Sequence, residues 1–142
     1  MSGPPQGQAL TAGSVTEFST GISAGASLRG IATGPDGNLW FTDLGGDRIG
    51  RITPAGAITE FSAGITPGAH SQGITAGPDG NIWFTELDGN RIGRITPAGV
   101  VTEFSSGLST SSGPADITRG PDGNLWFVER FGHRIGRITT AG

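Results

Sequence analysis

The feature that most constrains the fold of this chain is an internal repeat. The stretch Gly34 to Phe41 returns as Gly77 to Phe84 and again as Gly120 to Phe127, each time 43 residues further along. Neighbouring motifs keep the same spacing without any gap, among them Arg-Ile-Gly-Arg-Ile-Thr and Thr-Glu-Phe-Ser. A period of this length predicts a solenoid or a propeller, in which each unit buries its apolar faces against its neighbours.

Three units, residues 14–56, 57–99 and 100–142, account for the chain after a leader of residues 1–13. The leader has neither the basic start nor the apolar stretch of a secretory signal, so we expect a flexible tail. A cytoplasmic location is the default expectation, although a processed, exported form would look the same.

Composition narrows the classes of partner. The net charge is −3 and every one of the nine basic residues is Arg, which argues against nucleic acid or an anionic membrane as partner, since both need a basic surface. No apolar run reaches membrane-spanning length. The chain has no Cys, which excludes disulfides, thiolate metal sites and thiol nucleophiles.

Each unit contains four short segments suited to β-strands. In the second unit they cover residues 71–76, 81–86, 91–96 and 100–105. Between the first two, Pro-Asp-Gly supplies a tight turn, because Pro presets φ and Gly accepts a positive φ. The second segment is apolar on both faces, as in a sheet that lies between two other sheets. The prediction is an all-β propeller with three four-stranded blades.

Closure of the ring requires a second chain. Three blades fall short of the four to eight that propellers need, so a monomer would leave apolar flanks open, including the Trp40 and Trp126 layers. The chain opens with an outer strand, residues 14–19, and the third blade, residues 114–139, lacks one. We therefore expect residues 14–19 to complete that blade in a partner chain, giving a homodimer with six blades.

These residues also resemble a known family. The run Gly73 to Glu86, Gly-Ile-Thr-Ala-Gly-Pro-Asp-Gly-Asn-Ile-Trp-Phe-Thr-Glu, and the following Asn-Arg-Ile-Gly-Arg-Ile-Thr-Pro from Asn90 are similar to the blade repeat of virginiamycin B lyases, also called streptogramin lyases. The resemblance covers the chain from about Ser14. It implies a seven-bladed, Mg²⁺-dependent propeller that opens a cyclic antibiotic by elimination.

The family's site residues do not all carry over. The resemblance implies a histidine directly before the Gly-Ile of the first strand in two blades, where this chain has Arg29, Gln72 and Ala115. The acidic residue after Trp-Phe-Thr persists as Glu86, with Glu129 at the same place in the third unit, so these two are the family-matched catalytic candidates. A carboxylate that recurs once per blade is more simply part of the repeating scaffold.

A ligand would bind where strand ends meet. The start of the first strand, the end of the second and the start of the third lie at one end of a blade, and the residues there vary between units, as in a binding site at a propeller mouth. The predicted ligand-binding face consists of Arg29, Asp43, Asp47, His70, Gln72, Glu86, Asn90, Glu129 and His133. His133 lies beside two arginines and is interpreted as a solvated loop residue rather than a general base.

Two other recurring side chains have structural interpretations. The outer-strand glutamates are expected to pair with the arginines of the neighbouring strand, which contributes roughly 0.2–1 kcal/mol for an exposed pair. The tryptophans of the doubly buried strand are expected in the core rather than stacked on a carbohydrate. The series are Glu17, Glu60 and Glu103, and Trp40, Trp83 and Trp126.

The sequence therefore favours a self-assembling propeller scaffold or binding module without an intact catalytic site and without a cofactor. One alternative is a lyase-like, Mg²⁺-dependent enzyme completed by oligomerisation. A third is an excised or engineered fragment of a longer propeller.

Overall fold

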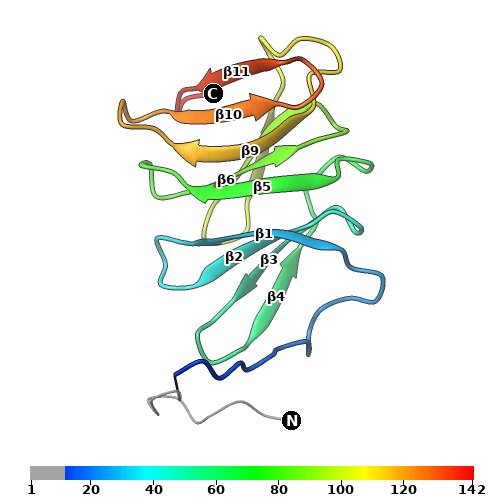
Figure 1. Cartoon of the computed structure of the whole chain (residues 1–142), viewed down its shortest axis with the longest axis vertical. Helices are drawn as coiled ribbons and strands as arrows, with labels where there is room; N and C mark the ends of the chain where they lie inside the picture. The colour runs from blue at the N-terminus through cyan, green and yellow to red at the C-terminus, as the bar shows by residue number, and fades with distance from the viewer. Residues whose placement is uncertain (1–11) are drawn as a thin grey trace.

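The structure is a computed structural model that describes residues 12–142. Most of the predicted leader, residues 1–11, lies outside the described residues. Eleven strands form three antiparallel sheets (Figure 1), and the described residues contain no helix, hence none that could cross a membrane. Sheet 1 contains β1 (Leu28–Thr33), β2 (Leu39–Asp43), β3 (Arg48–Ile52) and β4 (Ile58–Phe61). Sheet 2 contains β5 (Ser71–Ala76), β6 (Ile82–Glu86), β7 (Arg91–Ile95) and β8 (Val101–Phe104). Sheet 3 contains β9 (Pro114–Arg119), β10 (Leu125–Glu129) and β11 (Arg134–Ile138).

The predicted strands of the second unit agree with β5 to β8 within one residue at each end. The turn between β5 and β6 has the predicted chemistry, because Gly80 has φ 80° and the carboxylate of Asp79 accepts bonds from Asn81 and from Trp83 Nε1. The indole bond at 3.1 Å ties the turn to the buried strand. The repeat therefore fixes each hairpin through local contacts.

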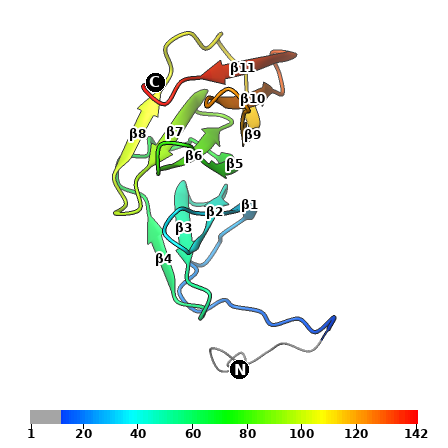
Figure 2. The same ribbon diagram turned by 90° about the vertical axis from the view of Figure 1, so that its left-hand side faces the viewer.

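The three sheets lie one beside the next in sequence order (Figures 1 and 2). The first strand of sheet 2, β5, contacts both β1 and β9, whereas β4 and β8 lie at the opposite edge, toward the left of Figure 2. Sheet 2 thus presents one face to sheet 1 and the other to sheet 3.

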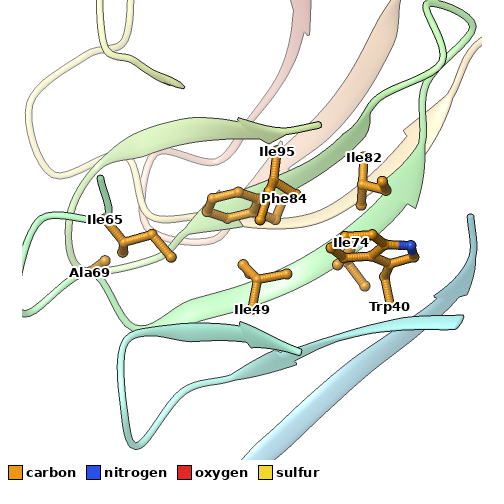
Figure 3. Packing of buried hydrophobic residues seen from close by; sticks show 8 residues of the cluster. All are labelled: Trp40, Ile49, Ile65, Ala69, Ile74, Ile82, Phe84 and Ile95. Carbon is orange, nitrogen blue, oxygen red and sulfur yellow. The ribbon is translucent and has the colours of Figure 1, made fainter. Parts of the chain in front are cut away.

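Apolar clusters fill both contacts between sheets. Trp40 and Ile49 of sheet 1 pack against sheet 2 (Figure 3), and the whole cluster consists of Trp40, Ile49, Ile65, Ala69, Ile74, Ile82, Phe84 and Ile95. Trp83 of sheet 2 packs in the same way against Ile117, Leu125 and Phe127 of sheet 3. Both tryptophans are 0% exposed, as expected for core residues.

One expectation about the flanks was wrong. Trp40 does not lie on the open side of sheet 1, because the tryptophan of each sheet faces the following sheet. Only Trp126, which has no following sheet in this chain, remains half-buried. The open flank of sheet 1 instead presents residues such as Ile31, which is 65% exposed, and that of sheet 3 presents Ile135, which is 71% exposed.

Residues 14–19 are not part of a strand in this single chain, and β11 has no fourth strand beside it. Their pairing stays a prediction. The segment nevertheless lies against sheet 1 in a defined way: a Cβ at Gly56 would be 2.5 Å from the Phe18 ring. A Cβ at Gly99 would be at the same distance from the ring of the outer-strand residue Phe61. Phe18 is therefore placed against sheet 1 as Phe61 is placed against sheet 2.

Candidate functional site

The residues predicted for the ligand-binding face lie at or beside the strand ends at one end of each sheet. In sheet 1 the end of β2 pairs with the start of β3, Asp43 with Arg48, and with the start of β1, Asp43 with Leu28. The same pairings recur in sheets 2 and 3. We call this end of the three sheets the strand-end face.

Asp43, predicted for the ligand-binding face, is instead enclosed. It is 0% exposed, and its carboxylate accepts bonds from Ser27 N at 2.8 Å, Gly45 N at 3.0 Å and Arg48 Nε at 3.1 Å. Three donors leave little capacity for another partner. Asp43 therefore anchors the loops at the end of sheet 1.

Asp47 and Asn90 connect neighbouring sheets. Asp47 accepts bonds from Gly68 N at 2.8 Å and His70 N at 3.0 Å, and Asn90 Oδ1 accepts one from Ser112 N at 2.8 Å. Burial raises the pKa of Asp47, but the bonds from His70 and Gly68 outweigh it and leave the pKa below the usual value. Both residues have φ near 50°, at 52° and 54°, a conformation that Asn and Asp tolerate well. Their side chains therefore connect neighbouring sheets and are not free to bind a ligand.

Threonine hydroxyl groups form a further connection between neighbouring sheets, which was not predicted from the sequence. Thr42 Oγ1 accepts a bond from Gly30 N and donates one to Gln72 O in the next sheet, both at 2.9 Å. Thr85 makes the same bridge between Gly73 N and Ala115 O. Gln72 thus contributes its carbonyl to the contact between sheets. The recurring Trp-Phe-Thr motif was the sequence signal for this bridge, but the carbonyl group that the threonine binds lies in another unit.

Glu86 is a buried carboxyl group without a hydrogen-bond partner among the described residues. It is 0% exposed, and its nearest cation, Arg91 Nη1, is 3.8 Å from Oε1. Burial, followed by the neighbouring Glu103 carboxylate, raises the pKa of Glu86 to about 9. Burial thus favours the protonated form of Glu86, and the side chain has no exposed surface through which a substrate could touch it.

Glu129, the second catalytic candidate, is 9% exposed, and its carboxylate lies 3.5 Å from Arg134 Nη1. His133 follows in the same loop, with φ 54°, and its backbone N donates to Glu129 O. It is exposed and occupies the position that Asp47 and Asn90 hold in the other units. His133 therefore lies on the open flank of sheet 3.

Two predicted residues keep accessible side chains. His70 is 42% exposed at its side chain and contacts the carboxylate of Asp88 through Nδ1. Arg29 is exposed on the open flank of sheet 1, so the structure does not bring it together with His133. Near Asp88, a cavity of about 510 Å³ opens between sheets 2 and 3. Its lining includes Leu87, Asp88, Asn90, Ser111 and Phe131.

The resemblance implied Mg²⁺, a hard cation that takes oxygen ligands. Within residues 12–142 no group of three or more His, Cys, Asp or Glu side chains could hold a metal ion. Asp43 and Asp47 accept bonds from backbone N–H groups, and Asp43 also accepts one from Arg48, so these two carboxylates have little capacity left for a cation. The residues of a single chain do not fit a magnesium site.

Comparison with solved structures identifies similar proteins. A streptogramin B lyase structure is 43% identical with a TM-score of 0.84, over 89% of this chain and 42% of that one. The catalytically inactive histidine-to-alanine variant of virginiamycin B lyase from Staphylococcus aureus, with quinupristin, is 40% identical with a TM-score of 0.85, over 92% of this chain and 44% of that one. A gluconolactonase from Xanthomonas campestris, at 19% identity and a TM-score of 0.67, shares the fold, over 82% of this chain and 45% of that one.

This chain thus spans less than half the length of the lyase structures that it matches. No curated protein sequence is significantly similar to it. The model of the virginiamycin B lyase family matches residues 5–142. The repeat, the three sheets and these matches together show that the chain belongs to the virginiamycin B lyase family.

Proposed function

We propose that this chain is a self-assembling propeller section that completes its ring with a second copy and binds a small molecule on the strand-end face. The observation that carries the proposal is the placement of Phe18 on Gly56. The same placement recurs at both contacts between sheets of the chain, with Phe61 on Gly99 and Phe104 on Gly142. In each case the phenylalanine belongs to the outer strand of the preceding sheet, β4 or β8. By analogy, residues 14–19, which contain Phe18, would form the outer strand of a sheet that precedes sheet 1.

The preceding sheet is sheet 3 of the second copy. It lacks an outer strand, and beside β11 lies a cavity of about 410 Å³. Residues 14–19 would fill it, because the cavity contains Phe104, Phe127, Ile138 and Gly142 at a strand edge. Two chains then give six four-stranded blades with a twofold axis, within the usual range for propellers.

The mass of the protein in solution tests the assembly. Light scattering at micromolar concentration is expected to give twice the chain mass of 14.4 kDa. A mass of 14.4 kDa at every concentration would overturn the proposal. A mass of three chains would replace six blades with nine.

Ligand binding is proposed at the cavity beside Asp88, where Asp88 and Ser111 supply polar groups and Leu87 and Phe131 supply apolar surface. A fragment screen followed by NMR shifts of assigned residues tests this location. Shifts confined to the opposite end of the sheets, around the Pro-Asp-Gly turns, would overturn it.

The second candidate is a lyase, favoured by the family. Against it, the histidine positions implied by the resemblance hold Arg29, Gln72 and Ala115, and Glu86 is enclosed. We expect no opening of quinupristin, with or without Mg²⁺. Elimination opens a ring without changing the mass, so chromatographic retention is the readout. Turnover that is lost in Glu86→Gln and Glu129→Gln would establish the lyase instead.

A further inference from the structure

The two open flanks of the chain carry opposite charges at positions that the repeat places in contact. We propose that Asp116 of one copy pairs with Arg29 of a second copy, and that this ion pair selects the head-to-tail contact between sheet 3 and sheet 1. The inference rests on the proposed self-assembly and names the residues that direct it.

Asp116 stands where the first two units have Gly30 and Gly73. A Cβ at Gly30 would lie 3.1 Å from Gln72 O, and a Cβ at Gly73 would lie 2.4 Å from Ala115 O. Arg29 is the residue of the first unit that corresponds to Gln72 and Ala115. A contact between sheet 3 and sheet 1 built like the internal ones therefore brings Asp116 against the backbone of Arg29.

Charge distinguishes this contact from the internal ones. At the two internal contacts the facing residues are neutral, glycine against Gln72 and glycine against Ala115. At the contact between copies they are Asp116 and Arg29, and both are exposed in the single chain. Opposite charges brought together at an interface favour the correct partner over others. The pair makes this contact different from any contact inside the chain.

Val128 supports the same inference. It occupies the position of Thr42 and Thr85 but has no hydroxyl group, so sheet 3 cannot form the bridge that joins the other sheets. The Cβ of Asp116 also cannot approach the facing carbonyl oxygen to 2.4 Å, the distance between a Cβ at Gly73 and Ala115 O. It requires a distance closer to the 3.1 Å between a Cβ at Gly30 and Gln72 O. The contact between copies is thus slightly wider and uses an ion pair in place of the threonine bridge.

The apolar surfaces around the pair are complementary. Trp40 packs on residues of the following sheet that include Ile74, Phe84 and Ile95. The corresponding residues of sheet 1 are Ile31, Phe41 and Ile52, which line an open cavity of about 290 Å³ together with Arg29. Trp126 lines the apolar cavity that contains Asp116 on the other flank. The indole of Trp126 would enter the cavity of sheet 1 while Asp116 meets Arg29.

The outer strand adds an independent prediction about the same contact. Glu60 accepts bonds from Ser23, and Glu103 accepts bonds from Thr66. Ser109 is the third member of this series and lines the cavity beside β11. Glu17 is the corresponding glutamate of residues 14–19. In the assembly, Glu17 of one copy accepts bonds from Ser109 of the other.

Charge exchange tests the proposal on the full chain. The dimer dissociation constant is measured by analytical ultracentrifugation for the wild type, Asp116→Arg, Arg29→Asp and the double variant. Each single variant is expected to dissociate about tenfold more readily, because like charges then face each other. The double variant is expected to recover the wild-type constant within about threefold. Arg119→Asp, on the same strand as Asp116 and also exposed, is the matched control and is expected to match the wild type.

The outcomes separate the two proposals. A wild type that remains monomeric would overturn the assembly and the ion pair together. A dimeric wild type with unchanged single variants, or a double variant that does not recover, would overturn the ion pair and leave the assembly standing. Circular dichroism of each variant identifies any loss of folding, and rescue by the double variant distinguishes pairing from a general loss of stability.

Discussion

Replacing Thr85 with Val removes the bridge between sheets 2 and 3 without changing the shape of the side chain. Thr85 is 0% exposed, and its hydroxyl serves both Gly73 N at 2.9 Å and Ala115 O. Val fits the backbone, because Val128 occupies the same position in sheet 3. The variant therefore leaves one buried donor, Gly73 N, and one partly buried acceptor, Ala115 O, without a partner.

The expected loss in the free energy of unfolding follows from those two groups. Each buried polar group left unsatisfied costs about 1–3 kcal/mol, and the loss of the buried hydroxyl offsets part of this, so we expect about 2–4 kcal/mol. For a chain of this size a change of 1 kcal/mol shifts Tm by about 4 °C. The melting temperature should fall by about 8–16 °C.

Urea and thermal unfolding followed by circular dichroism measure this loss at one fixed protein concentration, because association shifts apparent stability. The reverse substitution, Val128→Thr, is the matched control in dilute, monomeric protein: there Val128 is 43% exposed on the open flank, so little change is expected. A loss below about 0.5 kcal/mol for Thr85→Val would refute the reasoning that the threonine bridge holds the sheets together.

Three further predictions concern burial and closure. Glu86, whose pKa is raised to about 9, binds its proton more tightly folded than unfolded, so its contribution to stability is full below its ordinary pKa and is lost as pH rises toward 9. In Glu86→Gln this pH dependence of the free energy of unfolding should disappear. Urea unfolding of both proteins at about pH 5, 7 and 9 measures it, and a difference between variant and wild type that is the same at all three pH values would contradict the prediction. Trp83→Ala should cost about 3–5 kcal/mol, whereas Trp126→Ala should cost less in dilute protein and should weaken the dimer; equal losses without an effect on association would be inconsistent with an open flank. Deleting residues 1–19 removes the packing of Phe18 and exposes a strand edge, at about 1.5–3 kcal/mol for that side chain; a soluble product with an unchanged melting temperature would argue against closure by this segment.

The positions of the strands and turns could be predicted because they depend on nearby residues. Pro-Asp-Gly fixes its turn through φ preferences and through bonds that Asp79 accepts from Asn81 and Trp83, all within four residues. The exact repeat then transfers each hairpin to the next unit. For the same reason the sequence by itself indicated the family, since the motif lies within one unit.

The contacts between units could not be predicted from sequence patterns. The side on which Trp40 packs depends on sheet 2, and the roles of Asp47 and Thr42 depend on backbone groups 21 to 30 residues away in sequence. These polar side chains looked like a ligand-binding face because polar residues at strand ends are usually solvated. Only the tertiary structure decides that the neighbouring sheet supplies their partners and excludes water from Asp43 and Glu86, because burial is a property of what lies nearby in space.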